Sequence, residues 1–368
     1  MRYYIIAGEA SGDLHGSNLI KELKALNPLI DIRGWGGDKM QEAGATIVKH
    51  YRELAFMGFA EVIKNLPAIL RNFKTCKEDI EQYNPDVLIC IDYPGFNLRM
   101  ASWAKQKGIK VIYYISPQVW AWKEKRVRIM KKCIDKMLVI LPFEKEYYQS
   151  KWHWDVEYVG HPLAEVVDRF KNNYHENKIA DKPIIALLPG SRKQEIKEKL
   201  PVMLEMSNLF TDYQFIVAKA PGADESFYNE LLSKYPSVHY VTGKTYELLQ
   251  QATAALVTSG TATLETALFG VPQVVCYKGS WISYQIGKRL VNVKYISLVN
   301  LIMDRPIVKE LIQDDLNIKE LEASLSEILT ENKRKELAKQ YNELREVLKQ
   351  GGNASEKAAK SIVSFLNK

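Results

Sequence analysis

Short apolar runs alternate with helix-length segments along the whole chain. In the first half, the runs that read as strands are Tyr3–Ala7, Ile30–Gly34, Asp86–Ile91, Lys110–Ile115, Met137–Leu141 and Val156–Val159. After a polar stretch the alternation restarts, with predicted strands at Ile184–Leu188, Gln214–Ala218, Ala254–Thr258 and Gln273–Tyr277. Apolar strands separated by helices are typical of parallel sheets with crossover helices. The pattern predicts an α/β protein with two Rossmann-like domains facing a central cleft.

The same pattern sets the expected domain boundaries. A chain of 368 residues is too long for one typical core, which favours two domains. We expect an N-terminal domain over 1–168, a polar linker over 169–182 and a second domain over 183–345. The charged remainder, 346–368, is expected to be a helix that packs back on the N-terminal domain.

The stretch from Val257 to Glu265 reads as the end of a buried strand, a tight turn of small residues and a helix that stops at Gly270. A helix that opens at the carboxyl end of a strand directs unpaired N–H groups and a positive dipole at an anionic ligand. Thr261 and Glu265 are four residues apart and share one helix face, suited to phosphate oxygen and sugar hydroxyls. The alternative is that Ser259 and Thr261 only cap the helix and Glu265 is solvated.

The first strand runs into a turn, Gly8–Asp13, and a helix predicted over Leu14–Leu26. This turn lacks G-x-G-x-x-G, which argues against a dinucleotide dehydrogenase, and G-K-[S/T], which argues against a P-loop ATPase. It gathers Glu9, Ser11, Asp13 and His15 at one strand end, although Ser11 or Asp13 also suits a helix cap. In parallel sheets ligands collect at the carboxyl ends of strands, where the pattern also puts Asp92, Ser116, Trp120 and Trp122.

In the second half, Pro189–Arg192 follows a strand and precedes a helix. Ser191 and Gln194 fit a capping box, which accounts for both without a ligand. Arg192 does not fit, because a cation at a helix N-terminus opposes the dipole. An anion that bridges Arg192 and the N–H groups removes that conflict, and we expect a diphosphate there.

Two segments suggest a lipid or another anionic partner. Leu54–Phe73, which contains Met57 and Phe59, interleaves large apolar residues with Lys and Arg, as in a helix that lies in a membrane interface. Pro67 is expected to break or kink it, and an ordinary core-facing helix is the alternative. The net charge is +7, and Lys123–Lys136 holds seven basic and two acidic residues, which favours an anionic partner over an ordinary solvated face.

Composition argues against a disulfide-rich, secreted or membrane-spanning protein. The four cysteines are scattered without C-x-x-C pairs, as expected for reduced core residues of a cytosolic protein. No signal peptide is expected, and no apolar stretch approaches the roughly 18–20 residues of a spanning helix.

Five motifs, taken together and in order, resemble lipid-A-disaccharide synthase over nearly the whole chain. They are Gly8–Asp13, Ile91–Asn97, Ser116–Trp122, Leu187–Arg192 and Ser259–Glu265. The resemblance implies the glycosyltransferase B fold and the joining of UDP-2,3-diacylglucosamine to 2,3-diacylglucosamine 1-phosphate, giving a β(1→6) disaccharide phosphate and UDP. It implies a cytoplasmic protein peripherally associated with the inner leaflet of the inner membrane in Gram-negative lipid A synthesis. Some relatives form homodimers by exchanging carboxyl-terminal segments.

The resemblance implies an inverting transfer, because an α-linked donor gives a β product. Asp92 is the expected base, and the expected catalytic set also contains Glu9, Ser11 and Asp13. The expected UDP-binding residues are Ser191, Arg192, Glu195, Ser259, Gly260, Thr261, Glu265, Tyr277 and Asn300. The expected acceptor or membrane contacts are Met57, Phe59, Trp120, Trp122, Lys125 and Arg126.

No cofactor, metal ion or nucleic-acid partner is expected, because no D-x-D-like pair accompanies the diphosphate residues. The chain departs from the family pattern at Gly95, where many relatives carry an acid, and at Val299, which replaces a usual proline. Two alternatives remain at this point: a UDP-sugar epimerase of the same architecture, and a non-catalytic protein that binds anionic lipid or RNA. An epimerase would not need the apolar and basic segment Leu54–Phe73, because its substrate is a soluble nucleotide sugar. A non-catalytic binding protein predicts no binding of UDP.

Overall fold

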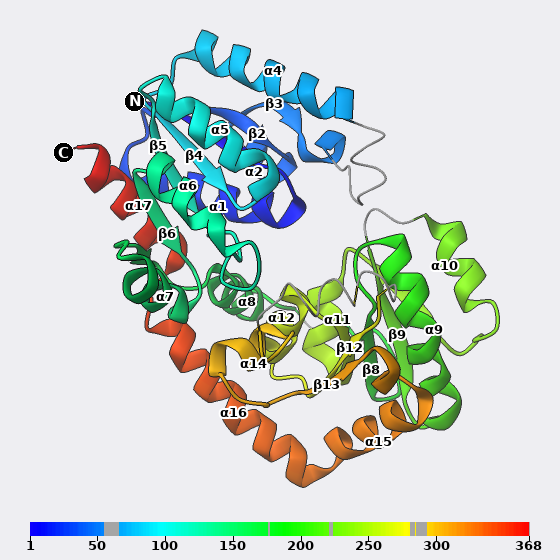
Figure 1. The fold of residues 1–368 in the computed structure, drawn as a ribbon. Helices are drawn as coiled ribbons and strands as arrows, with labels where there is room; N and C mark the ends of the chain where they lie inside the picture. The colour runs from blue at the N-terminus through cyan, green and yellow to red at the C-terminus, as the bar shows by residue number, and fades with distance from the viewer. Residues whose placement is uncertain (55–65, 176, 221–223, 280–283, 285–292, 368) are drawn as a thin grey trace. The chain divides into compact units, whose positions relative to one another are not determined.

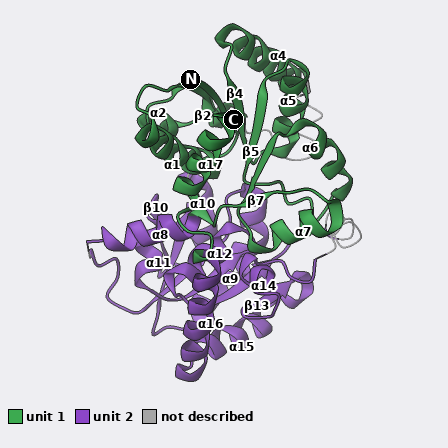
Figure 2. Ribbon diagram, turned by 90° about the vertical axis from the view of Figure 1, so that its left-hand side faces the viewer, with its two compact units in different colours: residues 1–162, 349–368 green, residues 163–348 purple. Residues whose placement is uncertain are grey.

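The computed structural model describes residues 1–54, 66–175, 177–220, 224–279, 284 and 293–367. The chain divides into two compact units, which Figure 2 colours separately: unit 1 is Met1–Pro162 with Lys349–Lys368, and unit 2 is Leu163–Leu348. Each unit is a parallel sheet with helices packed on it (Figure 1). The predicted α/β class, with two Rossmann-like halves, is confirmed.

The sheet of unit 1 has the strand order β3-β2-β1-β4-β5-β6-β7, and all its pairs are parallel. The direction in which successive strands are added to the sheet reverses between β1 and β4. The loops that leave these two strands therefore lie side by side at the carboxyl edge of the sheet. In chain order the strands are β1 (Arg2–Ala7), β2 (Asp31–Gly36), β3 (Thr46–His50), β4 (Val87–Ile91), β5 (Lys110–Tyr114), β6 (Lys136–Val139) and β7 (Glu157–Tyr158).

Helices cover this sheet, and the last of them comes from the end of the chain. The C-terminal helix α17 (Ala354–Leu366) packs against α1 (Ala10–Leu26). The other helical segments are α2 (Asp38–Glu42), η1 (Tyr51–Leu54), α4 (Leu66–Tyr83), α5 (Pro94–Gln106), η2 (Glu124–Arg126), α6 (Val127–Cys133) and α7 (Pro142–Trp152).

The sheet of unit 2 has the order β10-β9-β8-β11-β12-β13, again with parallel pairs and a reversal, here between β8 and β11. Its strands are β8 (Ile184–Leu188), β9 (Gln214–Lys219), β10 (His239–Thr242), β11 (Ala252–Thr258), β12 (Gln273–Tyr277) and β13 (Lys309–Ile312). Its helical segments are α8 (Pro162–Asn172), α9 (Lys193–Leu209), α10 (Glu225–Leu232), α11 (Thr245–Gln251), α12 (Thr261–Phe269), α14 (Leu298–Met303), η3 (Gln313–Asp315), α15 (Ile318–Leu329) and α16 (Glu331–Lys349).

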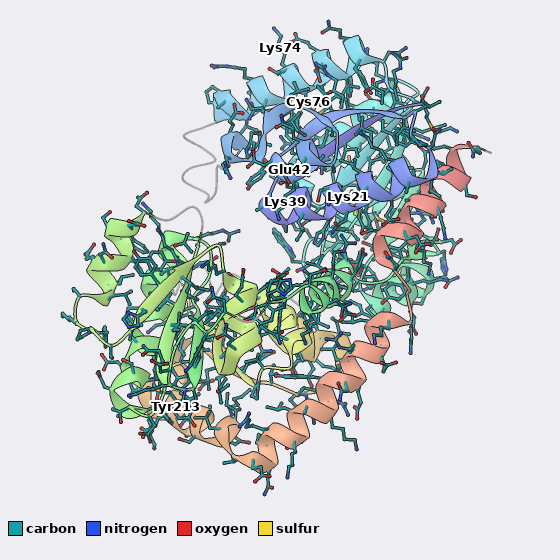
Figure 3. The ribbon with its side chains drawn as sticks, turned by 180° about the vertical axis from the view of Figure 1, so that it is seen from behind. Lys21, Lys39, Glu42, Lys74, Cys76 and Tyr213 are labelled. Atoms are coloured by element: carbon teal, nitrogen blue, oxygen red, sulfur yellow. The ribbon has the colours of Figure 1, made fainter. Side chains whose placement is uncertain are left out.

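Apolar side chains of the central strands form the core of each unit. All four cysteines are buried and free, as expected; Figure 3 labels Cys76 of α4. Among the described residues, none of the helices combines the length and apolar character required to traverse a bilayer.

Several elements differ from the prediction. The strands β3, β10 and β13 were missed because they are sheet edges with partly exposed side chains, so they lack an apolar run. Helix α1 starts at Ala10, not Leu14. The capping box of Ser191 and Gln194 is wrong, because α9 begins at Lys193 and has no side-chain cap. Pro67 lies in the first turn of α4, where proline is tolerated; the part of Leu54–Phe73 before Leu66 that it was expected to break lies outside the described residues, apart from Leu54.

The unit boundaries also differ from the expected ones. Unit 2 begins at Leu163, within α8, rather than at 183, and the segment 169–182 is partly the end of this helix. Phe170 packs against the core of unit 2, and Lys171 Nζ donates to Leu268 O at 3.0 Å, which ties α8 to this unit. At the other end, α16 stays in unit 2 up to Leu348, and the return to unit 1 begins at Lys349 rather than at 346.

Candidate active site

Glu9 and Asp92 follow neighbouring strands at the order reversal of unit 1. Ala7 at the end of β1 pairs with Ile91 at the end of β4, so the two carboxylates leave the same edge of the sheet. Asp92 does not cap the following helix, because the N-cap position of α5 is Tyr93 and no side chain caps it. Its carboxylate therefore has no structural task at the helix start.

The backbone of Asp92 is held in a strained conformation. Asp92 and Tyr93 have φ values of 43° and 48°, in the left-handed region that non-glycine residues rarely adopt. Two side chains clamp the carbonyl oxygen of Asp92: the Tyr113 hydroxyl donates to it at 2.6 Å, and Asn97 Nδ2 at 2.8 Å. Such strain persists only where surrounding contacts enforce it, and it concentrates at functional sites.

The Asp92 carboxyl group has an unusual acidity. Burial, the larger cause, and the negative charge of Glu9 together raise its pKa to about 7. A carboxyl group with a pKa near neutrality is ionised in part at physiological pH and is a stronger base than an exposed aspartate. The pair thus combines a candidate base with a neighbouring charge that tunes it.

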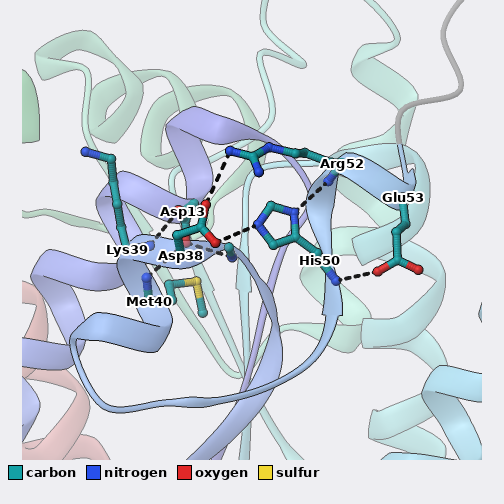
Figure 4. A network of polar contacts seen from close by, with 8 residues as sticks. Asp13, Asp38, Lys39, Met40, His50, Arg52 and Glu53 are labelled. Carbon is teal, nitrogen blue, oxygen red and sulfur yellow. Dashed lines mark hydrogen bonds and ion pairs between the residues drawn. The ribbon is translucent and has the colours of Figure 1, made fainter. Parts of the chain in front are cut away.

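The other members of the Glu9 turn lie in different environments. Asp13, in the first turn of α1, accepts hydrogen bonds from the N–H groups of Gly37, Lys39 and Met40 at 2.8, 3.2 and 3.0 Å, which anchors the start of α2 (Figure 4). Its oxygens are therefore occupied, which favours a positioning role over a catalytic one. Ser11 is exposed on α1, and burial lowers the pKa of His15 to about 4, so its imidazole stays neutral.

A buried carboxyl group that the sequence did not suggest lies in the next part of unit 1. Glu144, at the start of α7, is 1% exposed and accepts hydrogen bonds from Trp120 Nε1 at 3.2 Å and from the N–H groups of Ile140 and Leu141. Burial raises the pKa of Glu144 to about 7. Trp120 is thereby fixed in place, half-buried, with its ring edge-on to Phe143. The only sequence signal was an acid three residues after Leu141, in the N3 position of a helix.

Trp122 and its basic neighbours lie on the surface. The indole is 43% exposed, and Lys123 Nζ lies 4.1 Å from its ring centroid, with the Arg126 guanidinium at 5.8 Å. Lys125 is exposed in the same turn, η2, and Ile129 of α6 is 52% exposed. Met57 and Phe59 lie outside the described residues.

In unit 2 the turn between β11 and α12 has the geometry of an anion site. Gly260 precedes α12 with φ of 140°, a conformation that favours glycine, and no side chain caps the helix. The Ser259 hydroxyl donates to Ile296 O at 2.7 Å, so it braces a neighbouring loop. Thr261 is exposed as the first residue of the helix. The predicted cap by Ser259 or Thr261 is thus absent.

Glu265 lies half-buried one turn further along α12. Its Oε1 accepts a hydrogen bond from the Tyr246 hydroxyl at 2.8 Å, and burial raises its pKa. Tyr246 is its one hydrogen-bond partner in the part of the chain that the structure describes, which leaves the other carboxylate oxygen for a hydroxyl of a ligand. The alternative of a solvated first-turn acid is therefore not favoured.

The loop after β8 lies beside this turn, because Leu188 pairs with Val257. Arg192 Nη1 donates to Glu195 Oε1 at 3.0 Å. A carboxylate in the first turn of α9 thus offsets the conflict between the arginine and the helix dipole without a ligand, which sequence reasoning missed. Gly190 has φ of 116°, and a Cβ there would lie 2.9 Å from Glu195 Oε2.

The remaining predicted site residues of unit 2 differ in their exposure to solvent. Ser191 is exposed, and Tyr277 ends β12 half-buried, with its pKa raised by burial and then by Glu195. Asn300 is buried, and its amide is fully used: it donates to Val308 O and Glu310 Oε1 and accepts from the N–H groups of Ile307 and Val308. That arrangement favours a positioning role for Asn300 over direct contact with a ligand. Within the described ranges, no cluster of three His, Cys, Asp or Glu residues suits a metal ion.

Comparisons with known proteins show the family of the chain and its fold. The family described as lipid-A-disaccharide synthetase matches residues 3–364. A lipid-A-disaccharide synthase of Syntrophus aciditrophicus is 40% identical over 375 residues, covering 99% of this chain and 97% of the relative. The kitacinnamycin glycotransferase has a TM-score of 0.68 at 14% identity, covering 99% of both chains. The S. aureus MnaA–UDP co-structure has a TM-score of 0.70 at 12% identity, covering 100% of this chain and 97% of that one. These two structures share the fold, which is that of glycosyltransferase B proteins.

Proposed function

The chain belongs to the lipid-A-disaccharide synthase family, and on that premise we propose how its two units divide the reaction. The protein is a glycosyltransferase of lipid A biosynthesis that uses UDP-2,3-diacylglucosamine and 2,3-diacylglucosamine 1-phosphate. Membership of this family replaces the two alternatives drawn from the sequence, a UDP-sugar epimerase and a non-catalytic lipid- or RNA-binding protein.

Unit 1 supplies the base. Asp92 takes the proton of the acceptor 6-hydroxyl. As the proton leaves, the oxygen of this hydroxyl attacks the anomeric carbon of the donor. The bond from that carbon to the diphosphate oxygen breaks as the new bond forms, so one displacement turns an α-linked donor into a β product and releases UDP. The observation that carries this role is the half-buried, strained Asp92, whose pKa burial and Glu9 raise to about 7. A positioned base contributes about 10²–10⁴-fold to such a step.

Unit 2 binds the nucleotide. Arg192 and the first-turn N–H groups of α12 take the diphosphate, which stabilises the negative charge that develops on the leaving group with fixed dipoles. Glu265 takes ribose hydroxyls with the oxygen that Tyr246 leaves open. Ser259 and Asn300 hold the loops around this site through their hydrogen bonds to Ile296 and Val308.

We also propose that the protein associates peripherally with the cytoplasmic face of the inner membrane. The exposed Trp122, with Lys123 and Arg126 beside its ring, supports this contact, and exposed Lys125 and Ile129 follow it in the chain. Tryptophan suits a membrane interface, and each basic residue near an anionic leaflet adds about 1 kcal/mol. Dimerisation, which the resemblance implies, stays a prediction that light scattering tests.

The test is the reaction of the purified protein with both substrates, followed by phosphorus and proton NMR. We expect equal amounts of UDP and a β(1→6)-linked disaccharide phosphate, and no product when the acceptor is unacylated or absent. A product with an α linkage would remove the single displacement. Conversion of the UDP-sugar alone into its 2-epimer would replace the transferase function.

A further inference from the structure

We propose that Lys199 is a second cation of the nucleotide diphosphate site in unit 2, acting with Arg192 on the negative oxygens of UDP. The inference rests on the proposed binding of UDP to this unit. Neither the sequence motifs nor the family comparison points to this residue, because it lies two turns into α9, beyond the Leu187–Arg192 motif.

Lys199 is buried, and no described residue forms an ion pair with it. The residue is 2% exposed, and its Nζ forms no hydrogen bond or ion pair with any part of the chain that the structure describes. Lysine is almost never buried to this extent unless it is paired, because an uncompensated ammonium group is costly to desolvate. Lys219, also buried in this unit, shows the usual arrangement: its Nζ lies 3.6 Å from Glu225 Oε1. Among the described residues, Lys199 thus has acids nearby but no direct ion-pair partner.

The helix geometry directs this ammonium group towards the carboxyl edge of the sheet. Side chains on a helix lean towards its N-terminus, and Lys199 lies one turn after Glu195 on the same face. Glu195 in turn accepts from Arg192, and its other oxygen lies close to Gly190. A row of residues therefore leads from the middle of α9 to the loop at the strand-order reversal. It consists of Lys199 and Glu195 on the helix and Arg192 and Gly190 in the loop before it.

The charged groups around Lys199 are Arg192 and the acids Glu195 and Glu198, and neither acid lies within ion-pair distance of its ammonium group in the part of the chain that the structure describes. Glu195 and Glu198 lie on its own helix, Arg192 lies on the loop before it, and the Cys276 thiol faces it from β12. Glu195 already pairs with Arg192, and Glu198 is exposed. Burial lowers the pKa of Lys199 while Glu195 raises it, consistent with a charge that is only partly compensated. A diphosphate supplies the ion-pair partner that Lys199 lacks among the described residues, and charge-assisted contacts of this kind are the strong ones.

The experiment compares the affinity of UDP with that of uridine, which lacks the diphosphate, by isothermal titration calorimetry. The test variant is Lys199→Met, with Lys199→Arg as a rescue that keeps the charge. The matched control is Lys197→Met, which removes the same charge from an exposed position on the same helix. Circular dichroism and thermal unfolding report the fold of each variant.

We expect Lys199→Met to weaken UDP binding by about tenfold or more, a loss typical of one charge-assisted contact. Uridine binding should stay within about twofold, Lys197→Met should bind both ligands as the wild type does, and Lys199→Arg should recover most of the UDP affinity. The proposal is overturned if Lys199→Met and Lys197→Met bind UDP equally well, or if Lys199→Met loses UDP and uridine to the same extent. Should Lys199→Met fail to fold, Lys199→Gln replaces it under the same criteria. Absence of UDP binding in the wild type would instead overturn the nucleotide role of unit 2 itself.

Discussion

Replacing Asp92 with asparagine should stabilise the protein while it removes activity. The substitution keeps the shape of the side chain and removes its charge, and asparagine is well suited to the left-handed conformation at φ of 43°. Because the charged carboxylate is disfavoured in its buried position, the folded state benefits when that charge is absent. The burial that raises the pKa of Asp92, and so makes it a better base, thus also lowers the stability of the folded protein.

The magnitude follows from the pKa of Asp92, which rises from 3.8 to about 7 on folding. One pKa unit corresponds to about 1.4 kcal/mol, so the ionised group destabilises the folded state by up to about 4 kcal/mol above pH 7. The sign is that of a carboxyl group with a raised pKa: the folded state binds the proton more tightly, so stability falls as pH rises from 3.8 to 7. At pH 5 the penalty is up to about 2 kcal/mol, since only the unfolded chain is then largely ionised.

The assay is urea unfolding of the wild type and Asp92→Asn at pH 8 and pH 5. We expect the free energy of unfolding of Asp92→Asn to exceed that of the wild type by up to about 4 kcal/mol at pH 8 and by about half of this at pH 5. The control is Asp155→Asn, an exposed position of unit 1, which should change stability by less than about 0.5 kcal/mol. A difference that is absent at pH 8, or equal at both pH values, would refute the reasoning.

Three further substitutions, one of them with a matched control, test other parts of the site. Glu9→Gln removes a charge that raises the pKa of Asp92, so the acid limb of the pH profile of kcat/KM, near pH 7 in the wild type, should move to lower pH; an unmoved limb would contradict the coupling. Tyr113→Phe removes a donor to Asp92 O and should lower kcat by about five- to tenfold without changing the Kd of UDP. Tyr114→Phe, on the opposite face of β5, should keep the wild-type kcat; equal effects of the two would count against the clamp. Gly260→Ala, strained at φ of 140° by about 1–3 kcal/mol, should weaken UDP binding in calorimetry, and unchanged affinity would count against the α12 site.

The sequence predicted the central strands well and the edges poorly. Central strands such as β4 and β8 are buried on both faces and read as continuous apolar runs, so their positions follow from composition alone. Edge strands such as β3 and β10 expose part of their side chains and carry no such signal. The position of Asp92 at a strand end was predictable for the same reason that β4 was.

The environment of each site residue was not predictable, because it depends on contacts between distant parts of the chain. Asp13 looked like a catalytic acid or a cap of its own helix, but its partners are N–H groups of α2 more than 20 residues away. The strain at Asp92 needs Asn97 and Tyr113, and Glu144 takes its role from Trp120, on a different loop. Burial of Lys199 likewise requires the packed fold, since its sequence context, with acids and lysines on both sides, resembles a solvated helix.

The most direct test of the division of labour between the two units is the single-turnover rate of disaccharide formation by Asp92→Ala with both substrates saturating, so that binding does not limit the result. We predict a rate at least about 100-fold below that of the wild type, because the acceptor hydroxyl has lost its base. A rate within tenfold of the wild type would contradict the role of Asp92 and require another group to take the proton.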